Sequence, residues 1–250
     1  MRKLLMVLAV VSLFHQAGFG AGAPGFEIWV TNQYFDKIQI IDGKTLTLLK
    51  EIAVDEDGQE ATSKPHMILF SPDYKYAYVA ALGANKLVII DTAKGKIAAE
   101  IPTGNSPHAA VPSPDGKRVY VANLGDDTIT EVLTDTAAGR FELGKTINIR
   151  DGPSADGVTD RPTCIMFSAD SKKAYVTNAG DPNAEDPLLT GSISIIDVEK
   201  GEELADKRIE PIGKNACGLR RSYDGKLMYV DVGAPVHKLL VIDTQTDKSL

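Results

Sequence analysis

One short segment recurs along the chain and limits what the chain can fold into. Its copies alternate apolar and aromatic residues: EIWVTN (27–32), KYAYVA (75–80), KRVYVAN (117–123), KKAYVTN (172–178) and KLMYVD (226–231). The aromatic residue of each copy follows the previous one after 42 to 55 residues. A repeat of about this length is typical of four-stranded propeller blades. The sequence therefore predicts an all-β protein, a β-propeller with about five blades of which the last is incomplete.

Each repeat unit predicts four short strands joined by polar turns. The first strand is apolar and ends in a turn that begins with Ser and has Asp at its third position, at Ser71, Ser113, Ser168 and Ser222. Ser first, Pro second and Gly fourth is the chemistry of a type I turn. The third strand ends on Asp in four units, whereas the third unit has Leu133 there. We assign these repeated Tyr and Asp residues to packing and to turns, because Asp can accept a hydrogen bond from the backbone two residues on.

The repeat text resembles the YVTN-type β-propeller family of secreted and cell-surface bacterial and archaeal proteins. The matching segments are GNSPHAAVPSPDGKRVYVAN (104–123) and YVANLGDDTITEV (120–132), and the resemblance covers nearly everything after residue 25. It implies the fold and no single function, because that family has many roles. More distantly, the repeats are similar to the haem-carrying propeller of nitrite reductase and to the propeller subunits of amine dehydrogenases, which use one end of the channel for a cofactor or a partner.

The N-terminal residues 1–23 predict a secretory signal peptide, and residues 24–250 the propeller domain. Arg2 and Lys3 precede an apolar run at 4–14 that is too short to span a bilayer. We therefore expect an exported protein, periplasmic, extracellular or at the cell surface, with no membrane span after the signal is removed. Cleavage is expected between residues 20 and 23.

The two ends of the repeat array predict an open ring. After the signal peptide the first unit begins in its second strand, so we expect it to lack an inner strand. The fifth unit ends just past its third strand. Propellers have about 4–8 blades, so we expect the natural protein to continue to a seven-bladed ring; the alternative is an open arc of five units.

The net charge argues against nucleic acid as a partner. The chain has 27 basic and 34 acidic residues, a net of −7, and loss of Arg2 and Lys3 would leave 25 against 34, a net of −9. An acidic surface repels phosphate backbones and anionic membranes. A protein or a cell-surface ligand remains as the expected partner.

One position near the start of each inner strand is the strongest candidate site. Five residues before the turn serine, four successive units have His66, His108, Thr163 and Cys217. Propellers bind ligands mostly at the end of the channel where the inner strands begin. Imidazole and thiolate are ligands of transition metals, and His is a common axial ligand of haem. We consider a metal site of His66, His108 and Cys217 or a haem or quinone-type cofactor there, against the alternative that these side chains only bond a neighbouring blade.

Two arginines and two cysteines lie in the same inner strands. Arg220 and Arg221 occupy positions that are mostly apolar in other units, and a buried charge there needs a partner. One of them could hold an anionic ligand in the channel, or it pairs with an acid of a neighbouring blade, which we favour. Cys164 and Cys217 belong to adjacent units, and we favour two free, buried thiols over a disulfide.

Two insertions, 150–161 and 179–191, are rich in Gly, Pro and Asp and predict loops. We expect them to emerge on different parts of the ring, the first of them at the channel end where the inner strands begin. Long loops on a rigid scaffold often carry recognition.

Three functions remain open at the level of sequence. The chain lacks the common hydrolase, phosphate-binding, zinc-protease and C-x-x-C motifs. The first hypothesis is therefore an exported binding or scaffold module, without catalysis, for a protein, a glycan or a small ligand. The second is an accessory or redox propeller that holds haem, a metal or a quinone-type cofactor near His66, His108 and Cys217. The third is a lactonase-like hydrolase.

Overall fold

A computed structural model describes residues 11–15, 25–55, 62–150 and 160–250. The first three sheets consist of β1 (Val11–His15), β2 (Phe26–Asn32), β3 (Lys37–Asp42) and β4 (Leu48–Ala53); β5 (Pro65–Phe70), β6 (Tyr76–Ala81), β7 (Lys86–Asp91) and β8 (Lys96–Pro102); and β9 (Pro107–Pro112), β10 (Arg118–Asn123), β11 (Thr128–Asp135) and β12 (Arg140–Asn148). The last two consist of β13 (Pro162–Phe167), β14 (Lys173–Asn178), β15 (Ser192–Asp197) and β16 (Glu202–Glu203); and β17 (Ala216–Arg221), β18 (Leu227–Val232), β19 (Lys238–Asp243) and β20 (Lys248–Ser249).

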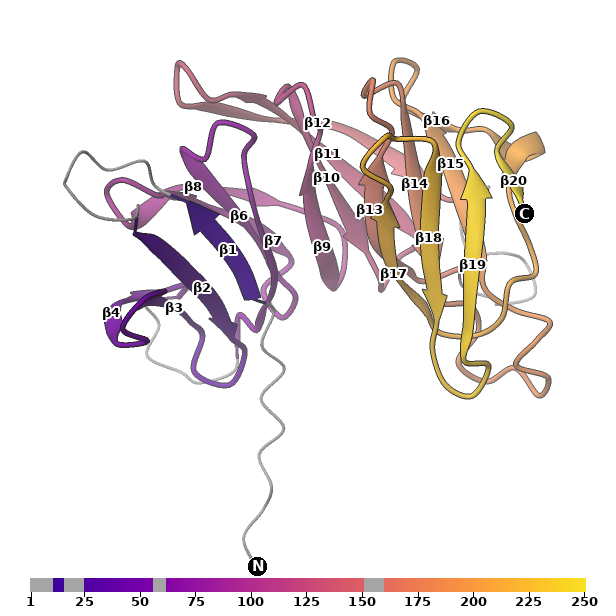
Figure 1. The fold of residues 1–250 in the computed structure, drawn as a ribbon, viewed down its shortest axis with the longest axis horizontal. Helices are drawn as coiled ribbons and strands as arrows, with labels where there is room; N and C mark the ends of the chain where they lie inside the picture. The colour runs from indigo at the N-terminus through magenta and orange to yellow at the C-terminus, as the bar shows by residue number, and fades with distance from the viewer. Residues whose placement is uncertain (1–10, 16–24, 56–61, 151–159) are drawn as a thin grey trace, which may run out of the picture.

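The five sheets follow one another along an arc, from β1–β4 in indigo to β17–β20 in yellow (Figure 1). In each sheet the four strands pair antiparallel in the order of the sequence. The first strand of one sheet packs against the first strand of the next, as in β5 with β9, β9 with β13, and β13 with β17. The expected propeller of four-stranded blades is thus confirmed.

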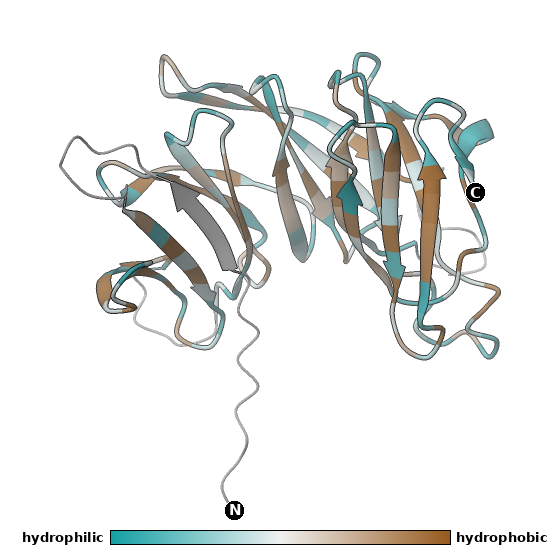
Figure 2. Cartoon of the chain, in the orientation of Figure 1, coloured by the Kyte–Doolittle hydropathy of each residue, from teal (hydrophilic) through white to brown (hydrophobic). Residues whose placement is uncertain are grey.

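The repeated aromatic residue fills the core between neighbouring sheets. Trp29, Tyr78, Tyr120 and Tyr175 are at most 1% exposed, whereas Tyr229 of the last sheet is 37% exposed. The second and third strands of the middle sheets are buried on both faces, as in β6 and β7, and the turns are mostly hydrophilic (Figure 2). A middle sheet therefore buries apolar side chains against the sheets on both of its sides, whereas no sheet of the described residues follows the last one, and Tyr229 is partly exposed.

The polar turns have the chemistry that the sequence predicts. Each turn serine donates its hydroxyl to the Asp two residues on; for example, Ser71 Oγ lies 2.7 Å from Asp73 Oδ1. The Asp that ends the third strand accepts backbone hydrogen bonds, as Asp91 Oδ1 does from Lys94 N at 2.9 Å. In the third sheet the strand β11 does not end at Leu133. It continues to Asp135, which accepts a hydrogen bond from Ala138 N at 3.0 Å.

The structure has a strand at each end of the array that the repeat pattern did not predict. The first sheet does have an inner strand, because β1 pairs antiparallel with β2, with Val11 opposite Val30 and His15 opposite Phe26. This strand comes from the segment that predicts a signal peptide, and the expected cleavage region lies outside the described residues. The fifth sheet also has a fourth strand, β20, which is two residues long.

The helical segment η1 (Ala205–Lys207) is three residues long. Across the described residues, no helix has the length and apolar character needed to cross a bilayer.

Candidate ligand-binding face

The inner strands all begin on one side of the molecule, which we call the channel-mouth face. The residue before each of four inner strands has a left-handed backbone: Lys64, Ser106, Arg161 and Asn215 have φ between 47° and 63°. Pro or Ala follows, and then the position that holds His66, His108, Thr163 or Cys217. The backbone thus repeats at this face while the side chains differ.

An Asp or Asn side chain of the preceding sheet holds the start of three of these strands. In each case a backbone N–H donates to a side-chain oxygen: Lys64 N to Asp36 Oδ1 at 2.7 Å, Ser106 N to Asn85 Oδ1 at 2.8 Å, and Arg161 N to Asp127 Oδ1 at 2.7 Å. Sequence reasoning missed these three acceptors. A usable signal was present, because each lies directly before the third strand of its unit, in a left-handed turn that Asp and Asn tolerate.

His66 and His108 form a stacked pair on this face. Their ring centroids are 4.1 Å apart, with an angle of 41° between the rings. His66 Nδ1 lies 3.1 Å from the carbonyl oxygen of His108, and His108 Nδ1 lies 3.0 Å from that of Thr163. A carbonyl oxygen only accepts, so each Nδ1 carries a proton and donates it. In the neutral ring each Nε2 is then an unprotonated acceptor.

The surroundings keep both imidazoles neutral. Burial lowers the pKa of His66 below its usual value. Burial, and then repulsion by a protonated His66 and by Arg161, lowers the pKa of His108 to about 4. Both rings therefore present an unprotonated Nε2 at pH 7, which can accept a hydrogen bond from water or bind a metal ion.

Thr163 and Cys217 continue the same row but are held differently. The Thr163 hydroxyl is buried and donates to the carbonyl of Ala216 at 2.9 Å. Cys217 lies with its Sγ 3.7 Å from that of Cys164. Within the described residues, no hydrogen bond joins the side chain of Thr163 or Cys217 to either histidine ring. The row thus divides into an imidazole pair and a thiol pair.

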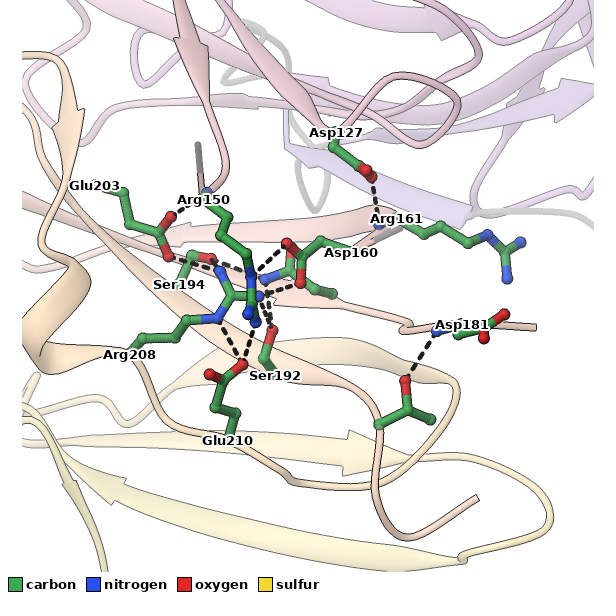
Figure 3. Close-up of polar contacts among 12 residues, drawn as sticks. Asp127, Arg150, Asp160, Arg161, Asp181, Ser192, Ser194, Glu203, Arg208 and Glu210 are labelled. Atoms are coloured by element: carbon green, nitrogen blue, oxygen red, sulfur yellow. Dashed lines mark hydrogen bonds and ion pairs between the residues drawn. The ribbon is translucent and has the colours of Figure 1, made fainter. Parts of the chain in front are cut away.

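Three acidic side chains surround one buried arginine beside this row (Figure 3). Arg208, whose side chain is 6% exposed, donates to Glu203 at 2.8 Å, to Glu210 at 2.9 Å and to Asp160. It also donates to Ser192 and Ser194 of β15. Burial by itself would lower the pKa of Arg208, but the carboxylates of Asp160 and Glu203 raise it overall. We call these residues with Arg150 the Arg208 cluster.

The Arg208 cluster joins the ends of the two insertions. The Asp160 carbonyl accepts from Gly180 N at 2.9 Å. A cavity of about 440 Å³ is lined by Arg150 and Asp160 from the first insertion and by Gly180 and Gly191 from the second. The expectation that the insertions emerge on different parts of the ring is therefore wrong. In an antiparallel four-stranded sheet, the connection between strands two and three leaves the same end as the connection into strand one. Residues 151–159 lie outside the described part.

Arg161 is a cation that directly precedes the inner strand β13. Its guanidinium contributes to lowering the pKa of His108. In Figure 3 its side chain points away from the Arg208 cluster, and within the described residues it makes no side-chain hydrogen bond or ion pair. Its position before Pro162 falls inside an insertion, where the repeat pattern gives no signal for it.

The favoured pairing of Arg220 or Arg221 with an acid is not what the structure shows. Arg221 donates to the carbonyl of Phe167 on the neighbouring sheet at 2.8 Å, and Arg220 donates to the carbonyl of Leu219. In the described parts of the chain neither makes an ion pair, since Arg220 is exposed and Arg221 finds a backbone acceptor instead. A ligand role for them stays a prediction.

The described residues contain no cluster of three or more His, Cys, Asp or Glu side chains that could hold a metal ion. The two Nε2 atoms of His66 and His108 can supply two ligands, and Cys217 would have to turn away from Cys164 to join them. The metal site of these three residues stays a prediction.

The fold agrees with a known family. The chain belongs to the family of lactonases with a seven-bladed β-propeller, whose description is "Lactonase, 7-bladed beta-propeller" and whose model matches residues 38–232. No curated protein sequence matches the chain. The resemblance to YVTN-type repeats stays a prediction beside this family.

Solved structures share the fold at low sequence identity. Kuenenia stuttgartiensis hydrazine synthase is 21% identical, with a TM-score of 0.68 over 88% of this chain and 60% of that one. The dihydro-heme d1 dehydrogenase NirN in complex with DHE is 20% identical, with a TM-score of 0.61 over 90% and 44%. The periplasmic gluconolactonase PpgL of Pseudomonas aeruginosa is 19% identical, with a TM-score of 0.66 over 89% and 65%. The chain thus spans less than two-thirds of the length of these relatives.

Proposed function

We propose that the protein to which this chain belongs hydrolyses a lactone at its channel-mouth face. The observation that carries the proposal is the stacked pair of His66 and His108, each with a proton fixed on Nδ1 and an unprotonated Nε2. Membership of the lactonase propeller family and the likeness to a gluconolactonase support the reaction class. This puts the lactonase-like hydrolase ahead of a module without catalysis.

The residues present can divide the work of ester hydrolysis. A neutral imidazole accepts a proton from water as the water attacks the lactone carbonyl. The guanidinium of Arg161, whose charge acts on His108, can stabilise the oxyanion of the tetrahedral intermediate and the carboxylate of the product. The proton on the imidazole then passes to the ring oxygen when the carbon–oxygen bond breaks.

The test is hydrolysis of glucono-1,5-lactone by the full-length protein, followed as acid release at constant pH. His66→Gln and His108→Gln are expected to include at least one variant whose kcat falls about 100-fold or more, because a general base contributes roughly 10²–10⁴-fold. His237→Gln is the matched control, since His237 is exposed and lies in a turn of the last sheet. Hydrolysis that both histidine variants leave at the wild-type rate would refute a catalytic role for His66 and His108.

A cofactor at the same histidines is the second candidate. The two basic Nε2 atoms that favour a general base would also suit an axial ligand of haem, and NirN in complex with DHE shares the fold. Haem titration of the full-length protein should then give an absorption band that His66→Gln or His108→Gln removes. If neither lactone hydrolysis nor a haem band is found, the remaining candidate is a binding module for a protein, a glycan or a small ligand. Removal of the N-terminal segment from the mature protein would support export.

A further inference from the structure

Two thiols from neighbouring sheets meet beside the histidine pair. Cys164 of β13 and Cys217 of β17 have their Sγ atoms 3.7 Å apart, and both are free thiols. The chain has no other cysteine. We propose that this pair is an oxidation site at which exchange with a small disulfide compound closes a covalent bridge between the fourth and fifth blades.

Irregular pairing brings the two sulfurs together. The register of β17 with β18 shifts between Ala216 and Leu219, so that Cys217 lies in a bulge. The register of β13 with β14 shifts between Pro162 and Cys164. A bulge re-aims a side chain out of the regular alternation of a strand, which explains how residues of two separate sheets can point at each other.

Hydrogen bonds between the sheets hold this arrangement. Thr163 Oγ1 donates to the carbonyl of Ala216 at 2.9 Å, and Thr177 Oγ1 donates to that of Cys217 at 2.9 Å. The backbones are thus fixed on both sides of the thiols. A disulfide has sulfurs about 2.05 Å apart, so rotation of the side chains has to close the remaining gap, while the strands stay in place.

The two thiols differ in access. Cys164 is 6% exposed, whereas Cys217 is only half-buried. The contact between the two thiols lowers the pKa of Cys217, while the same contact and burial raise the pKa of Cys164. The thiolate is the reactive form, so Cys217 is the first to react and Cys164 resolves the intermediate.

The exchange balances with one small disulfide as the oxidant. The Cys217 thiolate attacks one sulfur of oxidised glutathione, forms a mixed disulfide and releases one glutathione thiolate, which takes up a proton. Cys164 then loses its proton and attacks Cys217 Sγ, which forms the Cys164–Cys217 bond and releases the second glutathione. Two protein thiols are oxidised and one small disulfide is reduced to two thiols.

The experiment compares full-length protein treated with oxidised glutathione and with dithiothreitol. Peptide mapping by mass spectrometry without reduction should find one cross-linked pair that contains Cys164 and Cys217. The apparent Tm should be roughly 5–10 °C higher in the oxidised form, since a bridge across about fifty residues restricts the unfolded chain.

Single variants test whether Cys217 reacts first and Cys164 then displaces the bound glutathione. Cys164→Ser should retain one glutathione on Cys217, because nothing displaces it, whereas Cys217→Ser should remain largely unmodified at the buried Cys164. Two free thiols after oxidation of the wild-type protein, or only bridges between molecules, would overturn the proposal. The wild-type mapping decides the matter even if a serine variant does not fold.

Discussion

The histidines of the channel-mouth face illustrate how neighbours set the state of a residue. An imidazole in water titrates near pH 6.5. His108 donates its Nδ1 proton to the carbonyl of Thr163 and stacks on His66, and burial with nearby positive charge lowers its pKa to about 4. A ring in this state stays neutral over the whole neutral range, and its Nε2 is free to accept a hydrogen bond or to bind a metal ion.

Acid should therefore destabilise the fold through His108. Below pH 6.5 His108 becomes protonated in the unfolded chain. In the folded chain it stays neutral until the pH approaches its pKa of about 4. Stability is thus lost as the pH falls through this window, by about 2 kcal/mol between pH 7.5 and 5. Urea unfolding at both pH values measures the loss.

The matched comparison uses two glutamine variants. His108→Gln should lose distinctly less stability over this pH interval than the wild-type protein, because it cannot be protonated. His237→Gln, at an exposed turn, should follow the wild type. Equal pH dependence of wild type and His108→Gln would contradict the assigned neutral state.

At the scale of elements, the start of each inner strand depends on the sheet before it. Asp36, Asn85 and Asp127 each accept a backbone hydrogen bond from the residue before the next inner strand. The first two strands of a blade and the turn that follows them thus place the residues that the next blade presents at the channel-mouth face. Each blade therefore depends on the blade before it for the position of its inner strand.

The backbone is tightly packed at Gly191, in the connection between β14 and β15. Gly191 has a φ of 74°, and a Cβ there would clash with the carbonyl group of Gly213. Gly191→Ala should therefore cost more than about 2 kcal/mol, through backbone strain and the clash. Gly25→Ala is the control, because no atom lies within 4 Å of its Cβ position. Urea unfolding of both variants checks the difference, and similar midpoints would contradict it.

At the scale of the whole molecule, buried ion pairs connect the sheets in addition to apolar packing. Asp247, in the turn between β19 and β20, has a side chain that is 1% exposed. It accepts from Lys173 Nζ at 2.5 Å, Tyr175 OH at 2.5 Å and Lys207 Nζ at 2.8 Å. Burial would raise the pKa of Asp247, but these three donors lower it overall. The fifth sheet is thereby joined to the fourth.

Asp247→Asn should weaken this connection. The variant leaves two lysines with no carboxylate, and we expect a loss of about 2–3 kcal/mol at pH 7, measured by urea unfolding. Because the pKa of Asp247 is lowered, its contribution is present above the ordinary carboxyl pKa and disappears as the pH falls through the folded value. Asp206→Asn, at an exposed position, should change stability by less than about 0.5 kcal/mol. Equal stability of the two variants would contradict this role.

The repeated unit could be predicted from the sequence alone, because alternation, turn serines and strand-ending aspartates are local signals that each copy contains in full. Alignment of the copies also singled out the row of His66, His108, Thr163 and Cys217. The division of this row into an imidazole pair and a thiol pair, and the place of Arg161 near His108, came from the tertiary structure. Those outcomes depend on the contact of one sheet with the next, on bulges and on side-chain direction, and a repeat period contains no information on them.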